Sequence, residues 1–132
     1  MKLNGSTKRQ WTEYRSLKRR RETLHVSLNP RGVFLVNERG YELLGRPGAA
    51  VLLYDEKYQV IGLRLVSANE PNSFPFAARK GYSSRVVYAN GFCGKFKIKP
   101  RKTIIFPDPP FDENEGILEL DLHSAVEANP VK

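Results

Sequence analysis

The sequence predicts a mainly β (α+β) fold, a small β-barrel built from two similar units of strand, strand, short helix, strand and strand. Two observations predict it. The first is an internal repeat, since residues 33–55 align without gaps on residues 86–108 at a constant offset of 53 positions, which places Asn37 on Asn90. The second is that short apolar runs alternate with turn residues, a pattern typical of strands rather than of long helices.

Length and composition indicate one domain. The chain has 132 residues and is 40% hydrophobic, which is enough to bury a core. No apolar run approaches the ~18 residues that cross a bilayer, and the N-terminus lacks the apolar stretch of a secretory signal. The single Cys93 permits no internal disulfide, which fits a reducing compartment. We therefore expect a cytoplasmic protein with no membrane insertion, in which residues 23–123 form one domain.

The first unit spans about residues 24–66. Asn37 is a suitable N-cap for a short helix that runs to Leu44, because Gly45 follows as a typical C-terminal residue. Residues 29–32 are rich in turn formers and predict a hairpin. The strands expected in this unit are 25–28, 33–36, 50–54 and 58–66.

The second unit spans about residues 74–122 and follows a polar linker. Its helix, after the expected cap Asn90, is weak because Gly91 and Gly94 each cost about 1 kcal/mol relative to Ala. An acidic loop precedes the last strand, and residues 124–132 are expected to be a frayed tail. The strands expected in this unit are 74–78, 85–88, 103–106 and 117–122.

Residues 1–22 predict a basic N-terminal arm or amphipathic helix. Trp11, Tyr14, Leu17 and Leu24 recur at three- and seven-residue steps, and basic residues fill most of the remaining positions. The net charge of +8 is distributed in blocks. Residues 1–22 carry +6, residues 79–102 carry eight basic side chains and no acidic one, and residues 103–132 carry −6.

Basic blocks of this kind can neutralise the phosphates of a nucleic acid. The competing interpretation, to which we give equal weight, is a solvated surface in which lysines face water while Phe96 and Ile98 pack inward. For the arm, the alternatives are a nucleic-acid backbone, a membrane surface, an acidic partner or the acidic region 108–121 of the same chain. The candidate nucleic-acid contacts are Arg15, Lys18, Arg19, Arg20, Arg21, Arg79, Lys80, Arg85, Lys95, Lys97, Lys99, Arg101 and Lys102.

No motif predicts catalysis, a cofactor or a metal. His25 and His123 have no partners at metal-ligand spacing, and Cys93 in its apolar setting resembles a buried structural cysteine. Residues 112–116 contain only a fragment of a calcium loop. We therefore expect a protein that is not an enzyme.

The first unit resembles the DNA-binding domain of AbrB-like transcription regulators and MazE-like antitoxins, the swapped-hairpin fold. The resemblance rests on an opening glycine, alternating apolar residues and a closing Leu-Gly pair, here Gly32, Phe34, Val36, Leu44 and Gly45. It implies an interleaved barrel that is a homodimer in the family, and a chain that repeats the unit can supply both halves itself. We therefore expect a monomer or a homodimer.

The chain departs from the family at the positions where much of the DNA contact is expected. Val33, Asn37, Gly40 and Tyr41 stand where family members carry Arg, Pro, Leu and Arg. Other short segments, such as 53–55, resemble uncharacterised bacterial proteins with no assigned function.

The sequence thus favours a non-enzymatic nucleic-acid-binding protein, an AbrB-like bacterial regulator. The alternative is a protein-interaction module, antitoxin-like or a subunit of an assembly. The first needs basic residues on one exposed face, whereas the second needs an exposed apolar patch beside them.

Overall fold

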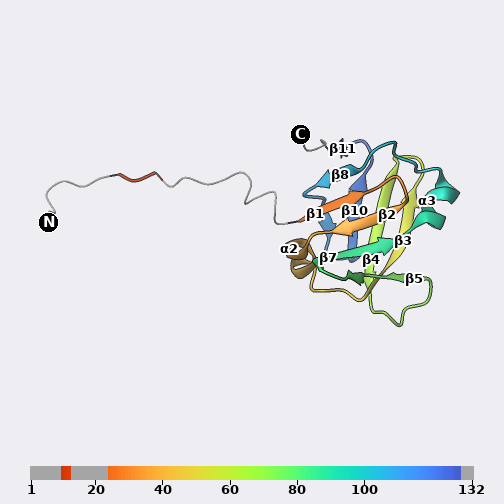
Figure 1. The fold of residues 1–132 in the computed structure, drawn as a ribbon, viewed down its shortest axis with the longest axis horizontal. Coiled ribbons are helices and arrows are strands. Elements are labelled where there is room, and N and C mark those ends of the chain that lie inside the picture. Colours follow the sequence, from red (N-terminus) through yellow and green to blue (C-terminus); the bar gives the residue numbers. More distant parts are fainter. Residues whose placement is uncertain (1–9, 13–23, 129–132) are drawn as a thin grey trace, which may run out of the picture.

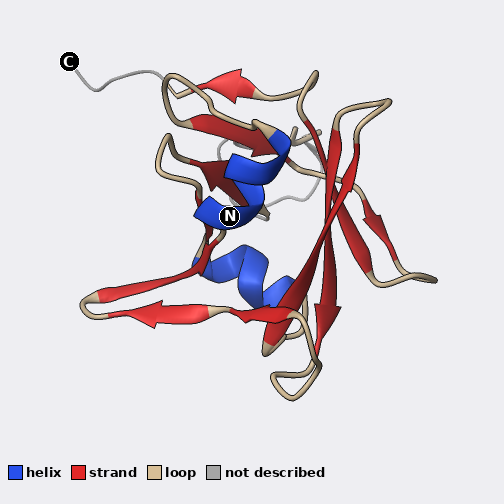
Figure 2. Cartoon of the chain, turned by 90° about the vertical axis from the view of Figure 1, so that its right-hand side faces the viewer, coloured by secondary structure: helices blue, strands red, loops and turns tan. Residues whose placement is uncertain are grey.

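Two antiparallel sheets enclose one core in the computed structural model, which describes residues 10–12 and 24–128 (Figure 1). Strands build most of the body and the helices are short (Figure 2). The first sheet, sheet A, has the order β11-β8-β1-β2-β7-β6. Its strands are β1 (His25–Leu28), β2 (Val33–Val36), β6 (Ala77–Arg79), β7 (Tyr82–Tyr88), β8 (Ile104–Pro107) and β11 (Val126–Glu127).

The second sheet, sheet B, has the order β5-β3-β4-β10-β9. Its strands are β3 (Ala49–Asp55), β4 (Val60–Val66), β5 (Ser73–Pro75), β9 (Phe111–Asp112) and β10 (Ile117–Asp121). The two helices of the described residues are α2 (Glu38–Leu43) and α3 (Asn90–Phe96). None of the helices in this part of the chain has the length and apolar character that crossing a membrane requires.

The mainly β class is confirmed, but the prediction of a closed barrel is wrong. The expected strand 74–78 is divided at the buried Phe76 into β5 in sheet B and β6 in sheet A. The Phe76 N–H donates to the carbonyl of Gly48 at 3.0 Å, so the chain changes sheets there instead of continuing one ladder. The outermost strands β5, β6, β9 and β11 are only two or three residues long, which limits further pairing at the sheet edges.

The two sequence units interleave across the sheets. β8 from the second unit pairs with β1 from the first, and β3 from the first unit pairs with β5 at the start of the second. β2 and β7 pair antiparallel, with Phe34 opposite Val87. β4 and β10 pair in the same way in sheet B. Each sheet therefore contains strands from both units.

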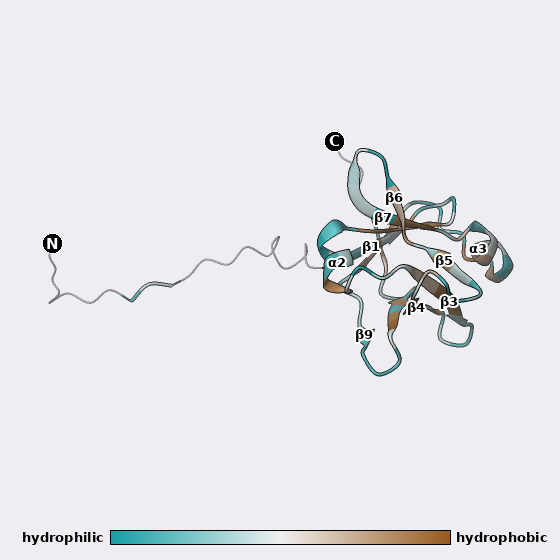
Figure 3. Ribbon diagram, turned by 90° about the horizontal axis from the view of Figure 1, so that it is seen from below, coloured by the Kyte–Doolittle hydropathy of each residue, from teal (hydrophilic) through white to brown (hydrophobic). Residues whose placement is uncertain are grey.

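The core lies between the sheets. Its largest fully buried side chains alternate along the strands with outward-facing ones, as the period of two requires. Hydrophobic stretches lie mostly in the sheets, and the connecting loops are mostly hydrophilic (Figure 3). The buried side chains are Phe34, Phe106, Leu28, Ile61, Leu63, Leu118, Leu120, Val26, Val36 and Val87.

Helix α3 is stabilised by packing rather than by its own propensity. Phe92 and Phe96 lie on one face and contact Tyr54, with ring centroids 6.3 Å and 5.0 Å from the tyrosine ring. Tertiary contacts of this kind normally decide whether a short helix forms. Two glycines in the helix are therefore tolerated.

The predicted cap position is confirmed for Asn37 but not for Asn90, and neither asparagine makes a side-chain capping bond. Asn37 occupies the N-cap position of α2, but its side chain makes no capping bond and Oδ1 instead accepts the N–H of His25 at 2.8 Å. Asn90 is the first residue of α3, with Ala89 at the cap, and its Oδ1 accepts the adjacent N–H of Gly91 at 3.0 Å. The side chain of Asn37 ties the helix start to β1, a contact that no local pattern indicates.

The predictions for the two chain ends have different outcomes. The predicted N-terminal helix falls mainly on residues 13–23, which lie outside the described residues, and Trp11 is 85% exposed. Leu24 belongs to the core. Residues 126–127, expected within a frayed tail, form β11 and pair with β8, because Ile104 and Ile105 offer an open ladder there.

Candidate nucleic-acid interface

One end of sheet A carries a group of basic residues from two separate segments, with a tyrosine from a third. Val33 in β2 lies opposite Tyr88 in β7, and Leu28 in β1 lies opposite Ile104 in β8. The β1–β2 turn and the segment that precedes β8 therefore leave the sheet at the same end. We call Arg31, Tyr88, Lys99, Arg101 and Lys102 the basic end of sheet A; Tyr88 and the basic side chains are all exposed.

Hydrogen bonds to a side chain and to the backbone hold the turn that carries Arg31. The Asn29 Oδ1 accepts the N–H groups of Arg31 and Val33 at 2.9 and 3.0 Å, a common way to stabilise a turn. The carbonyl of Gly32 accepts the N–H of Ala89 at 2.8 Å. A Cβ on Gly32 would lie 2.7 Å from the Cα of Asn90, so only glycine allows this approach. The turn is therefore fixed against the start of α3.

The lysines at the end of α3 and after it are exposed on either side of the buried Ile98. Ile98 is 5% exposed, and its N–H donates to the carbonyl of Cys93 at 2.8 Å. Lys97 closes the helix in the left-handed conformation, with φ at 59°. The predicted positions Lys95, Lys97, Lys99, Arg101 and Lys102 are exposed, while Phe96 packs against the core.

The β6–β7 hairpin carries a second basic group. The Arg79 guanidinium lies 4.0 Å from the centroid of the Tyr82 ring, and Lys80 is exposed at the turn. β7 pairs with β2 only from residue 85 onward, whereas its pairing with β6 begins at Tyr82. The tip of the hairpin therefore extends past β2.

Arg85 differs from the other predicted contacts because the fold already engages it. Its guanidinium lies 4.8 Å from the centroid of the Tyr41 ring and donates to the carbonyl of Ser83 at 3.1 Å. The hollow beside it, about 290 Å³ in volume, is also lined by Glu38 and Glu42 of α2. A phosphate would meet these carboxylates.

The structure thus divides the predicted residues into groups instead of gathering them into one patch. Arg79, Lys80 and Arg85 lie toward α2, whereas residues 95–102 lie at and after α3, and the two helices are at opposite ends of the molecule (Figures 1 and 3). Strand β7 connects the two groups. The predicted arm residues Arg15 and Lys18 to Arg21 lie outside the described residues.

Sequence reasoning missed three residues of this surface. Arg31 is a single basic residue in a turn, and only the strand register places it beside the segment 99–102. Tyr82 and Tyr88 are 62% and 60% exposed. Their positions in β7 could have identified the two tyrosines, because side chains along a strand alternate between its two faces and the tyrosines lie on the face opposite to the core-facing Val87.

Acidic residues gather on the other sheet. The turn after β3, the strand β10 and the loop between β9 and β10 carry Asp55, Glu56, Asp112, Glu113, Glu115, Glu119 and Asp121. Burial and the nearby carboxylates of Glu56 and Asp55 raise the pKa of Tyr54. The charges of the two sheets are therefore largely segregated, although Glu127 lies at the β11 edge of sheet A.

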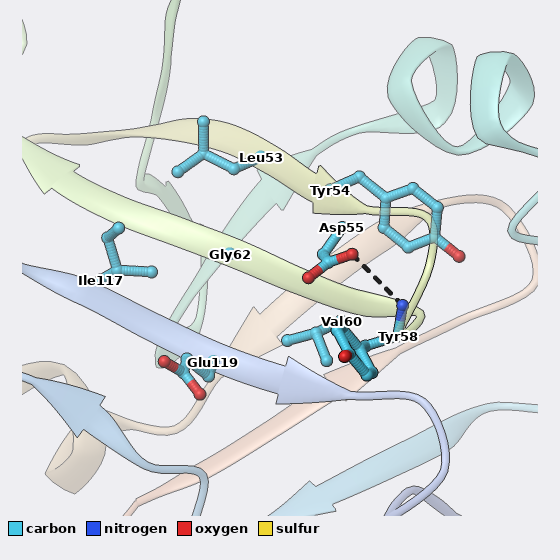
Figure 4. A pocket seen from close by; sticks show the side chains of 8 residues that line it. All are labelled: Leu53, Tyr54, Asp55, Tyr58, Val60, Gly62, Ile117 and Glu119. Carbon is cyan, nitrogen blue, oxygen red and sulfur yellow. Dashed lines mark hydrogen bonds between the residues drawn. The ribbon is translucent and has the colours of Figure 1, made fainter.

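A hollow of about 390 Å³ lies on the outer face of sheet B (Figure 4). Its floor is Gly62, where a Cβ would lie 3.1 Å from the Ile117 Cγ2 and 3.3 Å from the Leu53 Cβ. The Asp55 Oδ1 accepts the N–H of Tyr58 at 3.2 Å, which shapes the rim (Figure 4). This face is apolar in its centre and acidic at its margin.

The titratable side chains outside these surfaces are separate from one another. Burial lowers the pKa of His25 and raises the pKa of the Cys93 thiol, which is 3% exposed. Groups of three or more His, Cys, Asp or Glu side chains able to hold a metal do not occur within residues 10–12 and 24–128. Comparisons with protein-family models, with curated proteins and with solved structures find no match to this chain.

Proposed function

We propose that this chain is a non-enzymatic nucleic-acid-binding protein whose basic end of sheet A contacts the phosphate backbone. The observation that supports the proposal most strongly is the convergence of Arg31, Arg101 and Lys102 beside the exposed Tyr88. The acidic residues of sheet B lie on the other sheet, so this end can present a positive potential to a polyanion.

Lysines and arginines that face water suit backbone contact rather than base readout. Lys95, Lys97 and Lys99 project from a rigid helix end and from the segment that Ile98 anchors. Contacts of this kind position a protein on nucleic acid without reading its sequence. We therefore expect modest sequence preference, with the basic arm 1–22 extending the contact.

The interleaving of the two units supports a relationship to the AbrB-like fold. β8 completes sheet A beside β1, and β3 pairs with β5, so each unit depends on the other. A single chain can therefore provide both halves of an arrangement that the family builds from two chains. Function does not follow from this alone, because one fold hosts many functions.

Binding titrations at several salt concentrations test the proposal. The logarithm of the affinity should fall linearly with the logarithm of salt, by about 0.9 per neutralised phosphate on B-DNA. Deleting residues 1–22 should reduce this slope while the core remains folded, because Leu24 and the strands are retained. Changing Lys95, Lys97 and Lys99 to Gln should reduce the slope again. Absence of binding at low ionic strength would contradict the proposal.

The outer face of sheet B favours a second candidate, a protein-interaction module. Leu53, Val60 and Ile117 line its hollow, with Glu119 beside them. A partner with a basic margin and an apolar centre would complement this surface. Substituting Leu53 and Ile117 by Asp should abolish such an association while leaving nucleic-acid binding unchanged.

A further inference from the structure

We propose that the ligand is single-stranded nucleic acid, whose bases stack on tyrosines of the outer face of β7. This inference rests on the proposed function and names the ligand class for the same surface. It depends on Tyr82 and Tyr88, which serve neither the core nor a charge contact with phosphate.

The two tyrosines lie on one face of one strand. Tyr82 lies opposite Arg79 and Val86 lies opposite Ala77, and these two β6 residues share a face. Tyr82 therefore lies on the same face as Val86 and Tyr88 despite the register shift between Ala78 and Arg79, while Val87 on the opposite face is fully buried in the core. Both rings are more than half exposed, at 62% and 60%.

Val86 and the partly exposed Ser84 lie between the two rings along β7. Val86 is only 3% exposed although it lies on the outer face, and it pairs with Ala77 on one side and Leu35 on the other. Tyr82 also lines the hollow beside α2, which it shares with Glu38 and Glu42. A strand surface that carries two exposed rings suits the faces of unpaired bases.

Positive charge flanks both rings. The Arg79 guanidinium stacks 4.0 Å from the centroid of the Tyr82 ring, and Lys80 follows at the turn. At the other end, Tyr88 lies opposite Val33, next to the turn that carries Arg31. A strand of nucleic acid along β7 would therefore have its phosphates near basic residues at both ends and its bases over the tyrosines.

Single strands fit this arrangement better than duplexes. In a duplex the base faces are covered by neighbouring base pairs, so tyrosine rings on an open sheet have no base face to stack on. In a single strand the faces are free, and an aromatic ring can increase affinity about fivefold to a hundredfold for each stacked base. Arginine planes contribute in the same way, which suits the Arg79–Tyr82 pair.

The test uses fluorescence anisotropy with a labelled twelve-nucleotide single-stranded DNA, the RNA of the same sequence and the corresponding DNA duplex. The variants are Tyr82→Ala and Tyr88→Ala. Tyr58→Ala is the matched control, since Tyr58 is 61% exposed and has the Lys57 Nζ 5.3 Å from its ring centroid, but it lies on the sheet B side. Thermal unfolding by circular dichroism checks that each variant folds.

We expect the full chain to bind the single strands more tightly than the duplex. Each β7 variant should weaken single-strand binding about fivefold to a hundredfold, whereas Tyr58→Ala should leave it unchanged. The salt slope should stay at the wild-type value, because neither variant removes a charge. Tyr82→Phe and Tyr88→Phe should retain binding, since stacking needs the ring and not the hydroxyl.

Two other results would be decisive against the inference, and they differ in what they say about the proposed function. Tighter binding to the duplex, with both alanine variants equal to wild type, would overturn the single-strand inference and leave nucleic-acid binding in place. Absence of binding to all three probes at low salt would overturn the proposed function, and the inference with it.

Discussion

Phe34 and Val87 lie directly opposite each other where β2 meets β7, and they are also the residues that coincide when the two sequence units are superimposed at the offset of 53. On either side the register is antiparallel, with Val33 opposite Tyr88 and Leu35 opposite Val86, whereas the repeat aligns Val33 with Val86 and Leu35 with Tyr88. Within the β2–β7 ladder, Phe34 and Val87 are therefore the one pair that the repeat aligns and that also lies opposite across the two strands. Both residues of this pair are fully buried.

Truncating one residue of this pair should destabilise the whole domain. We expect Phe34→Ala to lower the free energy of unfolding by about 3–5 kcal/mol, since it leaves a cavity between the sheets. The measurement is urea unfolding followed by circular dichroism. Leu43→Ala, at a side chain that is 52% exposed on α2, is the control and should change stability by less than about 1 kcal/mol. Similar destabilisation of both variants would contradict a common core at this pair.

A side chain at Gly32 should disrupt the contact between the β1–β2 turn and α3. Gly32 and Gly81 both have φ at 83°, so alanine costs about 1–2 kcal/mol of backbone strain at either site. Only Gly32 has the Cα of Asn90 2.7 Å from the added Cβ, whereas nothing lies within 4 Å at Gly81. Gly32→Ala should therefore be the more destabilising in urea unfolding. Equal destabilisation at the two sites would mean that the turn and the helix start do not need this approach.

The two asparagines at equivalent positions should differ in their effect on stability. Asn37→Ala removes the acceptor of the part-buried His25 N–H, which should cost about 1–3 kcal/mol. Asn90→Ala removes only an exposed bond to its neighbour Gly91, so its effect should stay within about 0.5 kcal/mol. Thermal unfolding of the two variants measures the difference. A larger effect at Asn90 would contradict these assignments.

Stability should fall as the pH decreases through the range in which His25 titrates. Burial lowers the pKa of His25 below its ordinary value of 6.5, so the unfolded chain takes up the proton first as the pH falls. The stabilisation is complete above pH 6.5 and is lost below it, down to the lower pKa of the folded state. His25→Gln should flatten this part of the stability profile. Parallel profiles for wild type and His25→Gln would contradict this assignment.

The order of the main elements could be predicted from local patterns, but the assignment of strands to the two sheets could not. The alternation in 25–28 and 33–36 and the apolar run at 49–55 are visible in the sequence. Nothing local shows that Phe76 is buried while its neighbours belong to different sheets, because that depends on the carbonyl of Gly48. The short strands β9 and β11 also form only because a longer strand already offers its edge.

Charge blocks indicated the exposed lysines of the site but could not separate Arg85 from them. Arg85 and Lys95 look alike in a count of charges, yet Arg85 contacts Tyr41 and Ser83 while Lys95 is exposed. The register shift between Ala78 and Arg79 alters which residues of the hairpin face each other. Arg31 becomes part of the site only through the pairing of distant strands, which no block of charge reveals.

The most direct test of nucleic-acid binding at the basic end of sheet A compares two triple variants that remove the same charge. One is Arg31→Gln, Arg101→Gln and Lys102→Gln. The other is Arg46→Gln, Lys57→Gln and Arg64→Gln, at positions after α2, in the β3–β4 turn and in β4. The measurement is the salt dependence of binding to a labelled single strand. The first variant should reduce the log–log slope by about 0.7 for each phosphate that it no longer neutralises, and the second should keep the wild-type slope. Equal changes in both variants, or no change in the first, would contradict the account.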